Sequence, residues 1–261
     1  MATRSKLHFY VINLPKCQDR KERMIKRLTH HNFLDKTTFI EAIDQNSPLV
    51  EWIQTGVSVP FTSRKCEHAC FLSHLKALRA FVSNPDVDEA IILEDDVMFH
   101  NDFENRLSLV LNSRNGAELI MLCYLNFAND YRVCHKIYNP SEPDKPLSLC
   151  TIIEYIFGAQ AYWITKKYAA EILVKLDQNI GHLGETFVTS ELITRLSGGY
   201  FVAPPLAIED TVYSTLRMND EINRHREFFR NFGMENYNKG DDVDPREIWK
   251  PVGYNPLTSK E

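Results

Sequence analysis

The chain has 261 residues, a formal net charge of −5 and a pI near 6.0. Hydrophobic residues make up 44% and charged residues 25%, which fits one large globular domain or at most two. No basic run stands out, so a nucleic-acid partner is not expected. No apolar stretch approaches the ~18 residues of a transmembrane segment, and the N-terminal segment lacks a small-residue cleavage site. These features predict a cytoplasmic protein whose membrane contact, if any, is peripheral.

The six cysteines are irregularly spaced in a long chain. This pattern does not fit a secreted disulfide scaffold and predicts free thiols in a reducing compartment. The stretch CEHAC places Cys66 and Cys70 around His68, which suits zinc only if a second ligand pair follows at zinc-site spacing. None follows, and four residues is also one helical turn, so we interpret this stretch as structural.

Strand-like and helix-like runs alternate through the first half of the chain. The predicted strands span 7–14, 37–43, 90–93 and 118–125, and the predicted helices span 15–31, 66–82 and 102–111. Residues 45–64 contain turn residues without a clear period and are interpreted as a loop. The alternation predicts an α/β fold with a mostly parallel mixed sheet flanked by helices.

The second half is less regular. Residues 131–148 are polar and proline-containing, which predicts a hairpin or an excursion over the sheet. A strand-like run at 152–164 is interrupted at Gly158. Helices are predicted at 166–176 and 184–196, and a late strand at 200–202. Because the chain becomes strongly charged after Arg217, we predict one domain over 1–217, then a charged helix and a loosely ordered tail over 218–261.

Three adjacent carboxylates, Glu94, Asp95 and Asp96, follow the predicted strand 90–93. Ligands bind at the carboxyl ends of strands in parallel α/β sheets. Alternation along an extended segment would aim Glu94 and Asp96 one way and Asp95 the other. Such carboxylates repel unless a cation lies between them, and Mg²⁺ or Mn²⁺ commonly uses one or two carboxylates plus substrate phosphates. The motif predicts a metal-diphosphate site with Asp96 as first ligand and Glu94 as second, the alternative being a solvated acidic turn.

Two other kinds of phosphate chemistry fit less well. A P-loop needs a Gly-Lys pair, and the sequence contains none. An aspartyl-phosphate enzyme would need its nucleophile at the first acidic position. Glu94 is a poor phosphoryl acceptor there, and the motif lies in mid-chain rather than on the first strand.

Five stretches in order resemble glycosyltransferase family 25: VINLPKCQDRKERM at 11–24, EAID at 41–44, CEHACFLSHLKAL at 66–78, ILEDDVMFHNDF at 92–103 and GAQAYWITKKYAAEIL at 158–173. The family includes bacterial lipopolysaccharide and lipooligosaccharide galactosyltransferases and is related to collagen galactosyltransferases. The resemblance covers about residues 7–215. It implies a single nucleotide-binding domain of GT-A type, a nucleotide-sugar donor that is usually UDP-galactose, a divalent metal (Mn²⁺ or Mg²⁺) and inversion at the anomeric carbon.

Matched position by position, the resemblance implies a set of donor-binding residues. A guanidinium after the first strand can clamp a diphosphate, and a carboxylate after the second can accept a hydrogen bond from uracil or ribose. The implied set is Asn13, Arg20, Arg23, Asp44, Ser73, His74, Asp95, Gly158 and Tyr162.

Several members of this set have a second interpretation. The arginines could lie on a solvated helix face. His74 could contact the donor, support the acidic loop or be purely structural. Gly158 would let the backbone approach a sugar closely. Tyr162 or Trp163 could stack on that sugar or pack in the core.

The chain departs from the family pattern at two places. Gly184-Glu185-Thr186 stands where Pro-x-Asp is expected, and residues 214–216 read Ser-Thr-Leu where Ser-Asp-Ile is common. Glu185 is predicted to be the general base that takes the proton of the acceptor hydroxyl, with Glu191 as the next candidate. A third metal ligand or an acceptor contact stays open among His182, Glu209 and Asp210.

The combined prediction is a metal-dependent inverting glycosyltransferase. It moves galactose or glucose from a UDP-sugar to a hydroxyl of a glycan or glycoprotein acceptor. A lipopolysaccharide sugar, a protein-linked glycan and a hydroxylysine are all compatible acceptors. Because of the two departures, the alternative is a catalytically weakened relative that binds a nucleotide sugar or a glycan.

Overall fold

The structure is a computed structural model that describes residues 6–56, 64–114, 116–125, 134–140, 147–152, 157–179, 199–210, 225 and 227–237. Within these ranges, no helix has the length and apolar character needed to cross a membrane. The predicted helix at 184–196 and, within the predicted C-terminal segment 218–261, residues 218–224, 226 and 238–261 lie outside them.

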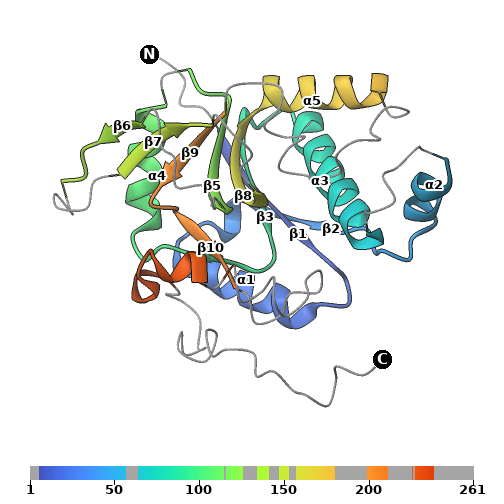
Figure 1. Ribbon diagram of the computed structural model, residues 1–261, viewed down its shortest axis with the longest axis horizontal. Coiled ribbons are helices and arrows are strands. Elements are labelled where there is room, and N and C mark those ends of the chain that lie inside the picture. Colours follow the sequence, from blue (N-terminus) through green and yellow to red (C-terminus); the bar gives the residue numbers. More distant parts are fainter. Residues whose placement is uncertain are drawn as a thin grey trace.

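An eight-stranded sheet forms the centre of the molecule, with the order β2-β1-β3-β8-β5-β9-β7-β6 (Figure 1). Its strands are β1 (Leu7–Asn13), β2 (Thr37–Glu41), β3 (Glu89–Glu94), β5 (Leu119–Leu125), β6 (Cys134–Ile137), β7 (Leu147–Thr151), β8 (Phe157–Thr165) and β9 (Tyr200–Ala203). Strands β7 and β8 run opposite to the others. The mixed sheet is therefore confirmed, and most of its strands point one way, but β7 and β8 make four of the seven pairings antiparallel rather than parallel. Two short strands, β4 (Val97–Phe99) and β10 (Ala207–Glu209), pair separately and antiparallel.

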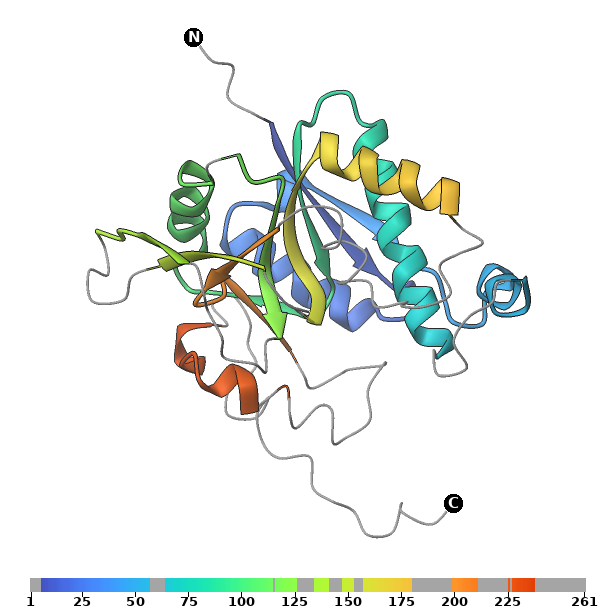
Figure 2. The same ribbon diagram turned by 45° about the horizontal axis from the view of Figure 1, so that its top comes forward.

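Helices cover the sheet on both sides (Figures 1 and 2). The described helices are α1 (Gln18–His30), α2 (Pro48–Gly56), α3 (Lys65–Ser83), α4 (Phe103–Asn112) and α5 (Lys166–Asn179), with 3₁₀ turns η1 (Leu34–Lys36) and η4 (Met234–Asn236). Helix α2 lies beside α3, away from the sheet. Helices α3 and α5 pack against each other on one face, and α1 lies on the other. This cover explains why residues 90–93 of β3 are fully buried.

Helix α1 shows how the sequence specifies one layer. Met24 and Leu28 are completely buried, as their helical spacing predicts. Arg20 and Arg27 lie on the same buried side, at spacings of four and three residues from Met24. The helix therefore packs its apolar residues on the sheet and brings two arginines to the carboxyl edge of the strands.

The loop predicted at 45–64 is wrong in part, because α2 occupies residues 48–56. Its N-terminus has a helix-start signal, in which Ser47 accepts a hydrogen bond from the backbone N–H of Leu49 and Pro48 follows it. Val50 and Ile53 are buried at a helical spacing of three residues, while Leu49 and Trp52 are exposed.

The prediction that all six cysteines are free thiols is also wrong. Cys134 and Cys150 are opposite neighbours in the antiparallel pair β6–β7 and form a disulfide. The predicted hairpin at 131–148 is confirmed where the structure describes it, but its register could not be read from cysteine spacing. Disulfides persist in oxidising compartments, so this one counts against the expected reducing environment.

The C-terminal segment contacts the main body where it is described. Residues 225 and 227–230 are helical, in agreement with the predicted helix. Phe229 is completely buried, and the Tyr237 hydroxyl donates to the carbonyl of Pro205 at 2.8 Å. The division of the chain at residue 217 stays a prediction.

Candidate active site

A cavity of about 130 Å³ opens where the loops after β1, β2 and β3 meet the N-terminal half of α3. This is the carboxyl edge of three parallel strands, the place where open α/β sheets bind ligands. The predicted site residues that line it are Arg20, Asp44, Ser73, His74, Glu94, Asp95 and Asp96. The structure thus brings together residues that lie up to 76 positions apart in the sequence.

The three carboxylates do not alternate as an extended segment would. Glu94 is the last residue of β3, whereas Asp95 and Asp96 form a turn that leads into β4. Because the turn ends the strand geometry, both aspartates reach Arg20 while Glu94 faces α3. The expected orientation of Glu94 with Asp96 against Asp95 is therefore wrong.

Arg20 holds the acidic turn from α1. Its Nη2 pairs with Asp95 and lies 3.0 Å from Asp96 Oδ2. The Asn13 side chain, at the end of β1, donates to Asp95 Oδ2 at 2.7 Å. All four side chains are buried, so the contacts of the arginine with the two carboxyl groups act in a site with little solvent screening.

Burial shapes the ionisation of this turn. It raises the pKa of Asp95 and raises the pKa of Asp96 well above its ordinary value, and the Arg20 charge opposes both shifts. Glu94, Glu209 and Asp95 raise the pKa of Asp96 further. Burial lowers the pKa of Arg20, but Asp96 and Asp95 outweigh it and the net pKa is raised. Arg20 therefore stays positively charged, and it stabilises the ionised form of its partners.

A second arginine fixes the other end of the turn. Arg27 donates to the Val97 carbonyl at 2.9 Å and to Asp210 Oδ2 at 2.7 Å. The Asp210 backbone N–H in turn donates to the Asp96 carbonyl at 2.6 Å. Sequence reasoning missed Arg27, although its helical spacing from Arg20 and Met24 was a usable signal.

Glu209 lies beside Asp210 at the end of β10 and lines the cavity. It accepts from Gln160 Nε2 at 3.0 Å and lies 3.0 Å from His225 Nδ1. Gln160 and His225 were also missed, and no local sequence signal links them to the acidic motif. Of the three residues left open as further contacts, Glu209 and Asp210 adjoin the site, and His182 lies outside the described residues.

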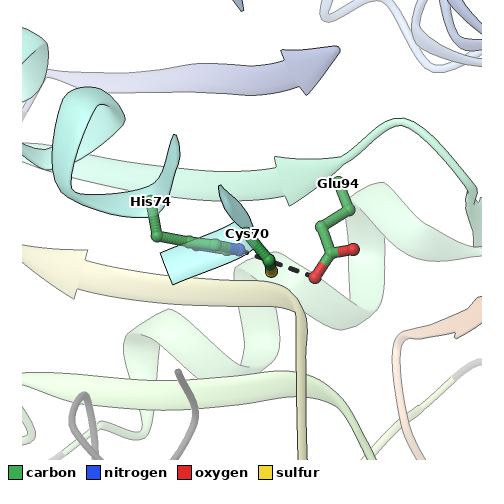
Figure 3. Close-up of side chains that lie close together, drawn as sticks. All are labelled: Cys70, His74 and Glu94. Atoms are coloured by element: carbon green, nitrogen blue, oxygen red, sulfur yellow. Dashed lines mark ion pairs between the residues drawn. The ribbon is translucent and has the colours of Figure 1, made fainter. Parts of the chain in front are cut away.

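Figure 3 shows the side of the cavity that Glu94 faces. His74 Nε2 lies 3.5 Å from Glu94 Oε1, and the Cys70 thiol is next to both. On the other side of the ring, His74 Nδ1 lies 3.2 Å from the Tyr162 hydroxyl. Burial raises the pKa of Tyr162 well above its ordinary value, so the hydroxyl keeps its proton.

Two predicted donor contacts have structural partners. The Ser73 hydroxyl accepts from the backbone N–H of Ile43 at 2.8 Å and donates to the Ala69 carbonyl, so it ties the loop after β2 to α3. Asp44 accepts from Lys16 at 2.6 Å on the exposed rim of the cavity.

Arg23, Gly158 and Tyr162 do not line the cavity. Arg23 pairs with Asp19 and lies 3.6 Å from Asp210. Gly158 has φ +90°, a conformation that favours glycine. Tyr162 and Trp163 are fully buried, so core packing describes them and sugar stacking does not. The predicted bases Glu185 and Glu191 lie outside the described residues.

The oxygen atoms of the acidic turn are suitable ligands for a divalent cation. Asp96 Oδ1 is buried without a hydrogen-bond partner among the described residues, and Glu94 lines the same cavity. Oxygens of this kind suit Mg²⁺ and Mn²⁺. The other oxygen of Asp96 is held by Arg20, so the arginine already supplies part of the positive charge that this site requires.

Comparisons with known proteins support one class. A model of "Glycosyltransferase family 25 (LPS biosynthesis protein)" matches residues 6–185. Procollagen galactosyltransferase 2 of Mus musculus is 25% identical over 174 residues, which cover 62% of this chain and 26% of the relative. Procollagen galactosyltransferase 1-B of Xenopus laevis is 27% identical over 63% of this chain and 27% of its own length. The chain therefore spans about a quarter of the length of these relatives.

Among solved structures, a glycosyltransferase involved in the glycosylation of the major capsid of PBCV-1 aligns over 86% of this chain and 99% of its own. Its identity is 10% and its TM-score 0.39. The family match covers more than half of the chain and includes the acidic turn at the carboxyl edge of the sheet. The chain belongs to glycosyltransferase family 25.

Proposed function

We propose that this chain transfers galactose or glucose from a UDP-sugar to a hydroxyl of a glycan or glycoprotein acceptor, with inversion at the anomeric carbon. The observation that carries the proposal is the acidic turn Glu94–Asp96 at a cavity between the ends of β1, β2 and β3. The names of the relatives, which are galactosyltransferases, favour galactose as the sugar.

Donor binding is assigned to the residues at the strand ends. The nucleoside would lie against the loop after β2, where Asp44 offers a carboxylate and Lys16 an ammonium group at the rim. Arg20 is the buried guanidinium nearest the acidic turn, and guanidinium groups recognise phosphate bidentately. Arg23 points to Asp19 and Asp210 instead and is assigned a supporting role.

Asp96 and Glu94 are the residues that would hold Mn²⁺ or Mg²⁺. When bound, such a cation supplies positive charge where the leaving UDP becomes negative. Arg20, which lines the cavity beside the two aspartates, would add its own positive charge against the negative charge of the transition state. Asn13 keeps Asp95 in place throughout, through a hydrogen bond from the end of β1.

The acceptor side rests on sequence alone. Glu185 is proposed as the general base and Glu191 as its alternative, because inversion by single displacement needs a group that takes the hydroxyl proton. A cytoplasmic site of action and a peripheral membrane contact remain part of the proposal, and the Cys134–Cys150 disulfide is the observation against a reducing compartment.

The test is UDP release from a panel of UDP-sugars, with Mn²⁺ or with EDTA. We expect metal-dependent release with one preferred donor. Asp96→Ala should lose most of this turnover while it still folds, which circular dichroism checks. Asp86→Ala is the matched control, because Asp86 is exposed and does not line the cavity. If Asp96→Ala turned over at the wild-type rate, the metal assignment would be wrong.

A catalytically weakened binding relative is the second candidate. The observation that favours it is the pairing of Arg20 with both aspartates, which balances their charge without a metal. A binding relative would bind UDP or a UDP-sugar in calorimetry without releasing UDP over hours. Turnover with any donor and acceptor would exclude this candidate.

A further inference from the structure

One group of side chains in the wall of the cavity has the composition of a transition-metal site. Helix α3 places Cys70 and His74 four residues apart, on the same side of the helix. The end of β3 brings Glu94 to them, and Figure 3 shows the three side chains converging. The Sγ, the imidazole nitrogen and the carboxylate oxygen all lie within 4.8 Å of one another.

The orientation of His74 is fixed from behind. Its Nδ1 lies 3.2 Å from the Tyr162 hydroxyl, and its ring stacks on that of Tyr162 with centroids 5.8 Å apart. Ligating histidines are commonly held in this way, with one ring nitrogen on an oxygen and the other on the metal. The ring therefore presents Nε2 to Cys70 and Glu94.

His74 Nε2 is the independent sign of a missing ligand. The side chain is only 2% exposed, and Nε2 has no hydrogen-bond partner among the described residues, with Glu94 Oε1 at 3.5 Å. A buried polar atom without a hydrogen bond is costly, so it is uncommon unless something binds there. Glu94 is 19% exposed and lines the cavity, so an ion can reach the group from solvent.

We infer that Cys70, His74 and Glu94 bind one Zn²⁺ ion, with its fourth coordination position open to the cavity. A thiolate, an imidazole and a carboxylate are ligands that Zn²⁺ prefers, whereas Mg²⁺ and Mn²⁺ favour oxygens alone. Binding releases the thiol proton of Cys70 to solvent. The inference does not rest on the proposed transferase activity, but it shares Glu94 with the donor-metal set, so the two ions compete.

The experiment uses the full chain, stripped with a chelator and titrated with Co²⁺ as a spectroscopic probe for zinc. We expect one equivalent to give tetrahedral absorption bands and a thiolate-to-cobalt charge-transfer band, and Zn²⁺ to displace the Co²⁺. Cys70→Ser should abolish the charge-transfer band. His74→Ala and Glu94→Gln should each weaken binding by at least about 10-fold.

Cys66→Ser is the matched control, because Cys66 lines the same cavity one helical turn away and lies outside the group. Cys66→Ser should keep the charge-transfer band. Asp96→Asn should keep this band as well, because Asp96 belongs to the proposed donor-metal site and not to the zinc site. Urea unfolding checks that each variant is folded. If Cys70→Ser does not fold, the loss of affinity in Glu94→Gln tests the site instead. The inference is overturned if no charge-transfer band forms, if the band survives Cys70→Ser, or if Cys66→Ser also removes it.

Discussion

Arg20 shows how far a residue's role can be predicted. Its position after the first strand suggested a phosphate clamp, and the structure does place it at the cavity. Its pairing with Asp95 and Asp96 could not be predicted, because the contact joins residues 75 and 76 positions apart and depends on a turn that breaks strand alternation. Sequence reasoning thus found the residue and the place, but not the partner.

The first prediction concerns the buried charges around Arg20. Arg20→Met leaves Asp95 and Asp96 buried without their cation, and breaking a buried pair from one side costs about 3 kcal/mol of unfolding free energy. Urea denaturation followed by circular dichroism measures the loss. Lys16→Met is the control, because its pair with Asp44 is exposed and its removal should leave the midpoint almost unchanged. Equal midpoints for the two variants would contradict the assigned role of Arg20.

The next prediction concerns Tyr162, which acts on the zinc ligand His74 rather than on the ion itself. Tyr162→Phe removes the hydroxyl at 3.2 Å from His74 Nδ1 and keeps the stacked ring. We expect zinc affinity to fall about 10-fold, since partners of a ligating histidine typically contribute that much. Tyr10→Phe is the control, because Tyr10 is also buried and accepts a hydrogen bond from Asn84. A similar loss of zinc affinity in both variants would refute the positioning role.

At the scale of elements, most predicted strands and helices were found, including the short strand β9 and helix α4, whereas helix α2 was missed. The strand Leu7–Asn13 and the helix Lys65–Ser83 agree with the predicted ranges to within about a residue. Helix α2 was missed because its nine residues show an apolar helical spacing over only about one turn. The disulfide was missed for a different reason, since pairing across β6–β7 depends on a register that the sequence does not display.

This disulfide gives a prediction for the β6–β7 hairpin. Closing a loop between positions 16 residues apart restricts the unfolded chain by about 3 kcal/mol. The double variant Cys134→Ala/Cys150→Ala should therefore unfold at lower urea concentration, and wild-type protein in reductant should match it. Cys66→Ala should behave as the wild type with and without reductant. Thiol titration of the denatured wild type should find four thiols. Six thiols would contradict the disulfide and support the expected reducing compartment.

At the scale of the whole molecule, the site depends on segments far apart in the chain. Helix α1, the end of β3 and the end of β10 meet through Arg20, Arg27 and Asp210. The described part of segment 225–237 completes this arrangement. His225 Nδ1 lies 3.0 Å from Glu209, and residues 228 and 229 pack in the core. A charged C-terminal segment can be recognised from composition, but the few aromatic residues that dock it can be recognised only once the partner surface is known.

The last prediction asks whether residues 225–237 are part of the folded unit, although the predicted domain ends at residue 217. Phe229 is fully buried, so Phe229→Ala should cost about 3 kcal/mol of unfolding free energy. A chain ended after Tyr237 should keep the wild-type midpoint, whereas a chain ended after Arg217 should unfold at markedly lower urea concentration, because it also loses His225 and Tyr237. Equal midpoints for the two truncated chains would instead support an independent domain at 1–217. The chain ended after Arg217 also lacks His225, which is a partner of Glu209 beside the acidic turn. We therefore expect its folded fraction to show weaker metal-dependent turnover than the chain ended after Tyr237.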